Sequence, residues 1–140
     1  MLFTRRMDYG LRILMALGMK RQGWVTAGAL AEAVEVPRPF ILKIVRDLAA
    51  AGLVLARRGV GGGVTLAKPA ADVSLLDILR ATDCPRALNA CLLEPRRCSR
   101  SRTCAAHRLL MPVQELLDAK LGELTLADLV REQRRGVRSR

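Results

Sequence analysis

Aromatic residues are scarce in this 140-residue chain, where they make up 3% of the sequence. Proteins that bind single-stranded nucleic acid stack bases on aromatic side chains, so this composition argues against such a partner. Acidic residues are also few, 13 against 24 lysines and arginines, which gives a formal net charge of +11. That excess favours a polyanionic partner, and double-stranded DNA fits best.

Long apolar runs are absent as well. No run approaches the length of a membrane span, and residues 1–10 carry charge without a following apolar signal region or cleavage site. We therefore expect a cytoplasmic protein with no membrane association. A chain of this length that is 51% hydrophobic can bury one core.

The residue clusters of most enzymes are missing too. The chain has one histidine, no Cys-X-X-Cys pair and no cluster of carboxylates, and its glycine-rich stretch is not followed by Gly-Lys-Ser/Thr. A thiol or metal enzyme is therefore the least favoured hypothesis, and we expect a protein that is not an enzyme.

What is present is a helix-turn-helix pattern near the N-terminus. A first helix follows Thr4 and ends before residue 20, and Thr26 can cap a short helix that runs to Ala33. Prolines break the chain before a further helix that ends near Ala51 and has one apolar face. The opposite face of this recognition helix is expected to meet the DNA groove through Arg38, Pro39, Lys43 and Arg46.

A β-hairpin is predicted next, with strands at residues 53–56 and 64–66. The glycine-rich tip between them lets the backbone approach a phosphate or a minor groove closely, and two arginines supply charge. Helix, turn, helix and hairpin is the order of a winged helix-turn-helix. The residues of this wing expected to contact DNA are Arg57, Arg58, Gly59, Gly61 and Gly62.

The C-terminal half is predicted to be helical. Ser74 opens a helix that runs to about residue 81, and an apolar stripe from residue 106 to 121 predicts a long helix that Pro112 either kinks or divides. Because the stripe exceeds what the N-terminal unit can cover, we expect it to pack against its copy in a homodimer. Thr125 opens a last helix, and residues 134–140 are predicted to be a disordered basic tail.

The expected fold is therefore mainly α with a small β-hairpin. Residues 1–72 form the winged helix-turn-helix, residues 73–104 a helix and a cysteine-rich loop, and residues 105–133 the dimerisation and C-terminal helices. 

Three cysteines and the chain's histidine fall within residues 91–107, namely Cys91, Cys98, Cys104 and His107. Thiolate is the soft ligand that selects zinc, copper(I) or iron-sulfur clusters, and three thiolates plus one donor fill four coordination positions. A structural zinc or a thiol-disulfide switch is the alternative to a cluster. Cys84 is additional, and is interpreted as a spare ligand, a redox thiol or a small buried residue. Asp8 lies four residues before Arg12 on the expected first helix, so we expect the two side chains to form an ion pair.

Several motifs, taken together, resemble the iron-sulfur winged-helix transcription regulators that include the nitric-oxide-sensing repressor NsrR and the cluster regulator IscR. These motifs are Phe3-Thr4 with Asp8-Tyr9-Gly10-Leu11-Arg12, the wing Arg58-Gly59-Val60-Gly61-Gly62-Gly63 with Lys68-Pro69-Ala70, the cysteine loop, and Thr125-Leu126-Ala127-Asp128-Leu129-Val130.

The resemblance implies a dimeric regulator, by preference a repressor, that binds an operator in double-stranded DNA. It implies that Cys91, Cys98 and Cys104 hold a 4Fe-4S or 2Fe-2S cluster through which nitric oxide, redox or iron-sulfur status is sensed. NsrR-like members imply Asp8 of the partner subunit as fourth ligand, whereas IscR-like members imply His107, and the sequence carries both.

Overall fold

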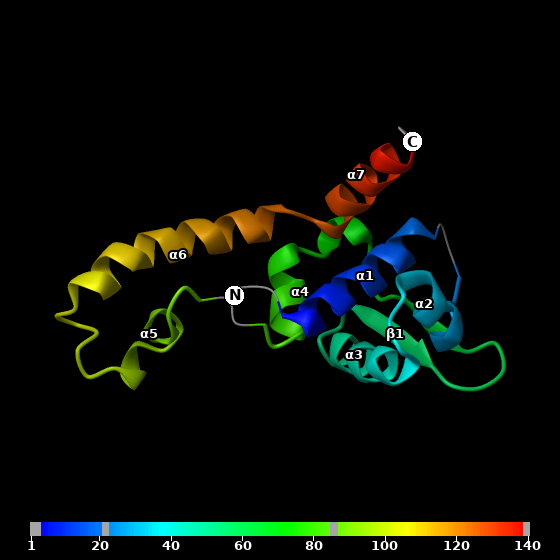
Figure 1. The fold of residues 1–140 in the computed structure, drawn as a ribbon, viewed down its shortest axis with the longest axis horizontal. Coiled ribbons are helices and arrows are strands. Elements are labelled where there is room, and N and C mark those ends of the chain that lie inside the picture. Colours follow the sequence, from blue (N-terminus) through cyan, green and yellow to red (C-terminus); the bar gives the residue numbers. More distant parts are fainter. Residues whose placement is uncertain (1–3, 21–22, 85–86, 139–140) are drawn as a thin grey trace.

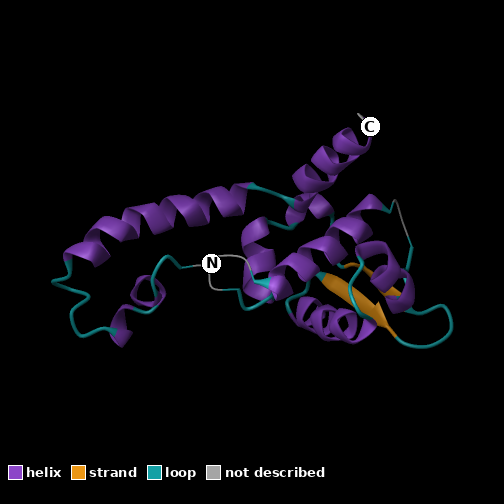
Figure 2. Ribbon diagram, viewed as in Figure 1, coloured by secondary structure: helices purple, strands orange, loops and turns teal. Residues whose placement is uncertain are grey.

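A computed structural model describes residues 4–20, 23–84 and 87–138. The expected Phe3 motif residue and the last two residues of the expected tail lie outside the described residues. Figure 1 shows a compact N-terminal unit from which a long helix extends, and Figure 2 shows that helices dominate. The α-helices and strands are α1 (Arg5–Met19), α2 (Ala27–Val34), α3 (Arg38–Ala50), β1 (Val54–Arg57), β2 (Gly63–Leu66), α4 (Leu75–Ala81), α5 (Ala90–Leu93), α6 (Ala105–Glu123) and α7 (Leu126–Arg138), with 3-10 turns η1 (Ala70–Asp72) and η2 (Pro95–Arg97).

The predicted helix-turn-helix is confirmed in α2 and α3. Thr26 caps α2 by accepting a hydrogen bond from the backbone N–H of Ala29 at 3.2 Å, and α2 ends at Glu35 in a left-handed conformation. Pro37 precedes α3, where a missing N–H costs nothing at a helix start. Buried apolar residues of α1, α2 and α3 pack together, which fixes the orientation of α3.

The predicted wing is confirmed as an antiparallel pair in which Val54 lies opposite Leu66 and Arg57 opposite Gly63. One feature was not predicted. Val25, just before α2, forms a bridge to Val64, with N–H to carbonyl distances of 2.9 and 2.8 Å in the two directions. The wing is therefore anchored to the segment that leads into the helix-turn-helix.

The winged-helix core also takes in both ends of the C-terminal half. Leu75 N–H donates to the Leu124 carbonyl and Leu126 N–H to the Val73 carbonyl, both at 2.8 Å. Val73, Ile78 and Leu126 belong to the same buried cluster as the residues of α1 and α3. The expected boundary after residue 72 therefore marks a difference in proposed function only. Helices α4 and α7 pack into the winged-helix core and belong to that unit.

Helix α6 extends away from this unit, and the segment of residues 87–104 lies beneath its far half (Figure 1). Of the two outcomes expected at Pro112, a kink or a division, the division is wrong, because Pro112 lies inside one continuous helix. Among the described side chains of α6, Gln114 and Leu121 are the buried ones. 

The expected disordered tail is also wrong for residues 134–138, which continue α7. Arg135 forms an ion pair with Glu132 at 2.7 Å, three residues earlier on the helix, and Arg134 donates to the Met19 carbonyl at 3.2 Å. The basic composition of this segment did not predict these contacts, which support a helix through its residues. No helix in the described part of the chain is long and apolar enough to cross a membrane.

Candidate functional site: a DNA-reading face and a cysteine cavity

The outer face of α3 carries the residues predicted to meet DNA. Ile41, Ile44, Val45 and Leu48 are buried against the core, which leaves the opposite face in solvent. The structure places Arg38, Pro39, Lys43 and Arg46 on the exposed side.

Two apolar residues of this exposed face were not predicted from the sequence. Phe40 is 53% exposed and Leu42 54% exposed. The signal was available, because both fall between the positions of the buried stripe. Exposed apolar side chains on a recognition helix can contact the methyl group of thymine. Phe40 also packs edge-on against Tyr9, with ring centroids 6.1 Å apart.

Arg6 of α1 connects α3 to the segment that follows α4 through two ion pairs. Its guanidinium contacts Asp47 of α3 at 2.5 Å and Asp83, just after α4, at 3.3 Å. Asp83 has a φ of +47°, which is uncommon for a residue other than glycine. The recognition helix is thus linked by one side chain to the point where the chain leaves α4 for the cysteine segment.

The wing presents its predicted residues at the far end of the hairpin. Arg57 and Arg58 are both exposed, and Val60 at the tip is fully in solvent. Gly62 is required by the loop itself, since a Cβ there would lie 2.4 Å from the Arg57 carbonyl oxygen. Gly62 is therefore needed to form the turn, whether or not DNA is bound.

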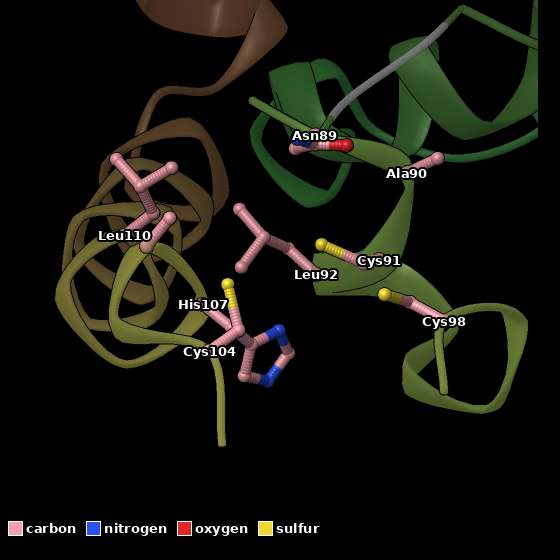
Figure 3. A pocket seen from close by; sticks show the side chains of 9 residues that line it. Asn89, Ala90, Cys91, Leu92, Cys98, Cys104, His107 and Leu110 are labelled. Atoms are coloured by element: carbon pink, nitrogen blue, oxygen red, sulfur yellow. The ribbon is translucent and has the colours of Figure 1, made fainter. Parts of the chain in front are cut away.

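The second region is a cavity of about 320 Å³ between the cysteine segment and the start of α6. Figure 3 shows Cys91 and Cys98 on the α5–η2 side, pointing toward the space that separates them from Cys104 and His107. The three cysteines and His107 therefore line one cavity, together with Asn89, Ala90, Leu92, Ala106 and Leu110.

Local structure explains how these side chains meet. Cys104 immediately precedes the first residue of α6, so its side chain lies at the start of that helix, one turn before His107. The loop before it is closed by a hydrogen bond from the Cys104 N–H to the Arg100 carbonyl at 2.9 Å. On the other side, Leu88 N–H donates to the buried Gln114 side chain at 2.8 Å, which ties the entry of the segment to α6.

The donor set suits an iron-sulfur cluster. His107 lines the cavity, and its buried Nδ1 has no hydrogen-bond partner among the described residues. No three metal-binding side chains of the described residues converge on a point that would hold a single metal ion. In a 4Fe-4S cluster each ligand binds a different iron atom, whereas a structural zinc holds four ligands around one ion.

Two other predicted residues lie elsewhere. Asp8 does not line the cavity, and its carboxylate pairs with Arg12 at 3.0 Å as the residues alone predicted. Cys84 is 6% exposed and belongs to the winged-helix core, which supports its interpretation as a small buried residue.

The comparisons with known proteins agree with this architecture. Residues 3–132 match the Rrf2 family, described as iron-dependent transcriptional regulators. An HTH-type transcriptional regulator of Aquifex aeolicus is 27% identical over 132 residues, covering 93% of this chain and 92% of the relative.

Two solved structures share the fold. The global cysteine regulator CymR of B. subtilis superposes with a TM-score of 0.75 at 22% identity, covering 94% of this chain and 98% of CymR. IscR of T. potens superposes with a TM-score of 0.73 at 22% identity, covering 95% of this chain and 88% of IscR. The family match confirms the resemblance seen in the sequence and sets aside the enzyme hypothesis. The chain belongs to the Rrf2 family and is a DNA-binding transcriptional regulator.

Proposed function

We propose that this protein is a cytoplasmic, homodimeric repressor whose operator binding responds to nitric oxide, redox or iron-sulfur status through a cluster held by Cys91, Cys98 and Cys104. The observation that carries the proposal is that these thiols, together with His107, line one cavity although they come from separate elements. The family's description as iron-dependent supports iron as the metal.

The fourth ligand is proposed to be His107 of the same chain or Asp8 of the partner subunit. His107 is favoured by its place in the cavity and by its unpartnered Nδ1. Asp8 would first have to give up its ion pair with Arg12, an exposed pair of the kind that contributes about 1 kcal/mol or less. When bound, an iron-sulfur cluster supplies reactivity toward nitric oxide and oxygen that the side chains lack.

The chain's own contacts provide a route from the cavity to the dimer. Cys104 and His107 lie at the start of α6, and Gln114 holds Leu88 at the entry of the cysteine segment. A change in how the segment is held is therefore proposed to change the position of α6. Since α6 leads through the Leu124–Leu75 backbone contact into the winged-helix unit, that change would reach the DNA-reading face.

The dimer is proposed to form through the exposed apolar side chains of α6. Leu109 is 74% exposed, Leu116 62% and Val113 49%, and they recur at the spacing of one helix face. A contiguous apolar stripe of this kind is typical of an interface. Two copies joined along α6 would present two recognition helices, as a two-fold operator requires.

Anaerobic purification tests the proposal. We expect a coloured protein whose iron and sulfide contents match a cluster, and operator binding that changes when nitric oxide is added or iron is removed. Colourless protein with stoichiometric zinc would select the structural-zinc alternative. Operator binding that is identical with and without iron would contradict sensing and leave the DNA-binding function intact.

A further inference from the structure

Arg57 and Arg58 are adjacent where β1 ends and the loop of the wing begins, but their side chains make different contacts. The guanidinium carbon of Arg57 lies 4.6 Å from the centre of the Trp24 ring, and its Nη2 donates to the Gly61 carbonyl at 2.6 Å. The side chain of Arg58 makes no hydrogen bond or ion pair with any other described residue. Arg57 is therefore engaged within the protein, and Arg58 is available to a partner.

Trp24 is held in place by the sheet. Its neighbour Val25 exchanges two backbone hydrogen bonds with Val64 of β2, so Trp24 lies where the anchoring segment meets the wing. Trp24 is 36% exposed, and its one ring contact with a cation in the described residues is with Arg57. The planar guanidinium stacks on an aromatic face while its N–H groups remain free to donate, a geometry that lysine cannot reproduce.

The contact at Gly61 closes the loop of the wing. Gly61 has a φ of +72°, and Gly62 N–H donates to the Gly59 carbonyl at 2.9 Å within the turn. A loop with this many glycines has many accessible conformations, so each cross-link that fixes it removes conformational entropy. Arg57 supplies such a cross-link, from the Trp24 ring on one side to the glycine turn on the other.

We infer that Trp24 and Arg57 form a positioning pair that fixes the conformation of the wing, and that Arg58 is the arginine of the two that contacts the DNA phosphates. The inference rests on the proposal that the wing contacts DNA. It revises the expectation that Arg57 and Arg58 contribute alike, because a guanidinium already bonded to a carbonyl and an aromatic ring has less to offer a phosphate.

The free protein provides the first test, which needs no DNA. Trp24 is the only tryptophan of the chain, so its fluorescence reports the contact directly. Replacing Arg57 with lysine should change Trp24 emission and its quenching by acrylamide, whereas the matched control Arg58→Lys should change neither. Trypsin cleavage of the Arg58–Gly59 bond, followed by mass spectrometry, should become several-fold faster in Arg57→Gln and in Trp24→Leu than in the native chain. Unchanged fluorescence in Arg57→Lys together with unchanged cleavage in Arg57→Gln and Trp24→Leu would overturn the inference.

Binding to a mixed-sequence DNA duplex at several salt concentrations provides the second test. Arg58→Gln should lower the slope of log affinity against log salt by about 1, the signature of a lost phosphate contact. Arg57→Lys, which keeps the charge, should weaken binding by about fivefold with an unchanged slope, and Trp24→Leu should do the same. If Arg57→Gln lowers the slope and Arg57→Lys restores native binding, Arg57 is a phosphate contact and the inference is wrong.

The two tests separate failure of this inference from failure of the proposed function. If Arg58→Gln leaves both affinity and slope unchanged, the wing does not contact DNA, and the assignment of Arg58 is wrong with it. The fluorescence and proteolysis results still decide whether Trp24 and Arg57 fix the loop.

Discussion

The winged-helix unit and the cysteine region are held together in different ways. The winged-helix unit buries a continuous apolar cluster that runs from Met7 to Cys84 and is completed by Leu121, Leu126 and Val130. Among the side chains described from residue 87 to 120, Leu92 and Gln114 are the buried ones. The first region is stabilised by its own packing, whereas the second has too little buried apolar surface to fix its conformation alone. The proposed cluster would supply cross-links that the packing of the cysteine region does not.

The largest expected effects are those of replacing Cys98 and Cys84, which should change opposite properties, one the absorbance and the other the stability. Cys98→Ala removes a thiol that lines the cavity, so the cluster absorbance of anaerobic protein should be lost completely while the free energy of unfolding of the metal-free protein stays unchanged. Cys84→Ala removes a sulfur atom from the core, so the absorbance should remain while the free energy of unfolding falls by about 1 kcal/mol. Absorbance spectra and denaturant unfolding of both variants provide the measurements.

The two cysteine variants could also respond in the same way. Loss of absorbance in Cys84→Ala at native stability would make Cys84 a ligand, and full absorbance in Cys98→Ala would remove Cys98 from the ligand set. Either result would contradict the proposal that the cysteine region holds the cluster while Cys84 only packs in the winged-helix core.

A pair of leucines distinguishes core packing from the proposed dimer contact. Leu14 is fully buried in α1, so Leu14→Ala should lower the free energy of unfolding by about 2–5 kcal/mol. Leu116 is 62% exposed on α6, so Leu116→Ala should leave that energy within about 0.5 kcal/mol in monomeric protein and shift the dimer toward monomer. Denaturant unfolding at fixed protein concentration and sedimentation over a concentration series measure the two effects. An unchanged dimer in Leu116→Ala would place the interface elsewhere.

The winged-helix unit follows closely from the sequence because local signals and packing agree there. Thr26 and Ser74 accept hydrogen bonds at helix starts as expected, and the apolar spacing of α3 predicted its buried face correctly. The bridge between Val25 and Val64 could not be predicted, because a pair so far apart in the chain is decided by tertiary packing and not by local pattern. The stacking of Arg57 on Trp24 follows from that bridge, which is why the two arginines looked equivalent in the sequence.

The cysteine region was less predictable for the same physical reason. Spacing alone predicted that Cys91, Cys98, Cys104 and His107 would gather, and the structure places them around one cavity. The role of Gln114 was missed, since a polar residue inside an apolar helical stripe usually faces solvent. Here it is 3% exposed and holds the Leu88 backbone. Helix α7 was underestimated at its end because its order depends partly on Arg134 reaching the end of α1.

The smallest expected effect contrasts the starts of α4 and α6. Ser74 and Asp77 form a capping box, in which Asp77 N–H donates to the Ser74 hydroxyl and Ser74 N–H donates to the Asp77 carboxylate, both at 3.1 Å. Cys104 stands at the corresponding position of α6 and makes no capping hydrogen bond through its side chain. Ser74→Ala should therefore lower the free energy of unfolding by about 1 kcal/mol at neutral pH. Cys104→Ala should leave it unchanged in metal-free protein.

The same pair differs in its dependence on pH. Partial burial raises the pKa of Asp77, but hydrogen bonding with Ser74 and the charges of Lys68 and Arg80 outweigh it, so the net pKa lies below the ordinary value of 3.8. The unfolded chain therefore binds this proton more readily than the folded one, and the stability contributed by Asp77 is complete above pH 3.8 and is lost as the pH falls through the folded pKa. Ser74→Ala removes part of the cause, so its unfolding free energy should fall less steeply below pH 4 than that of the native chain, whereas Cys104→Ala should keep the native slope. Equal slopes in all three proteins would mean that the cap of α4 contributes no more to the stability of the winged-helix unit than the uncapped start of α6 does to that of the cysteine region.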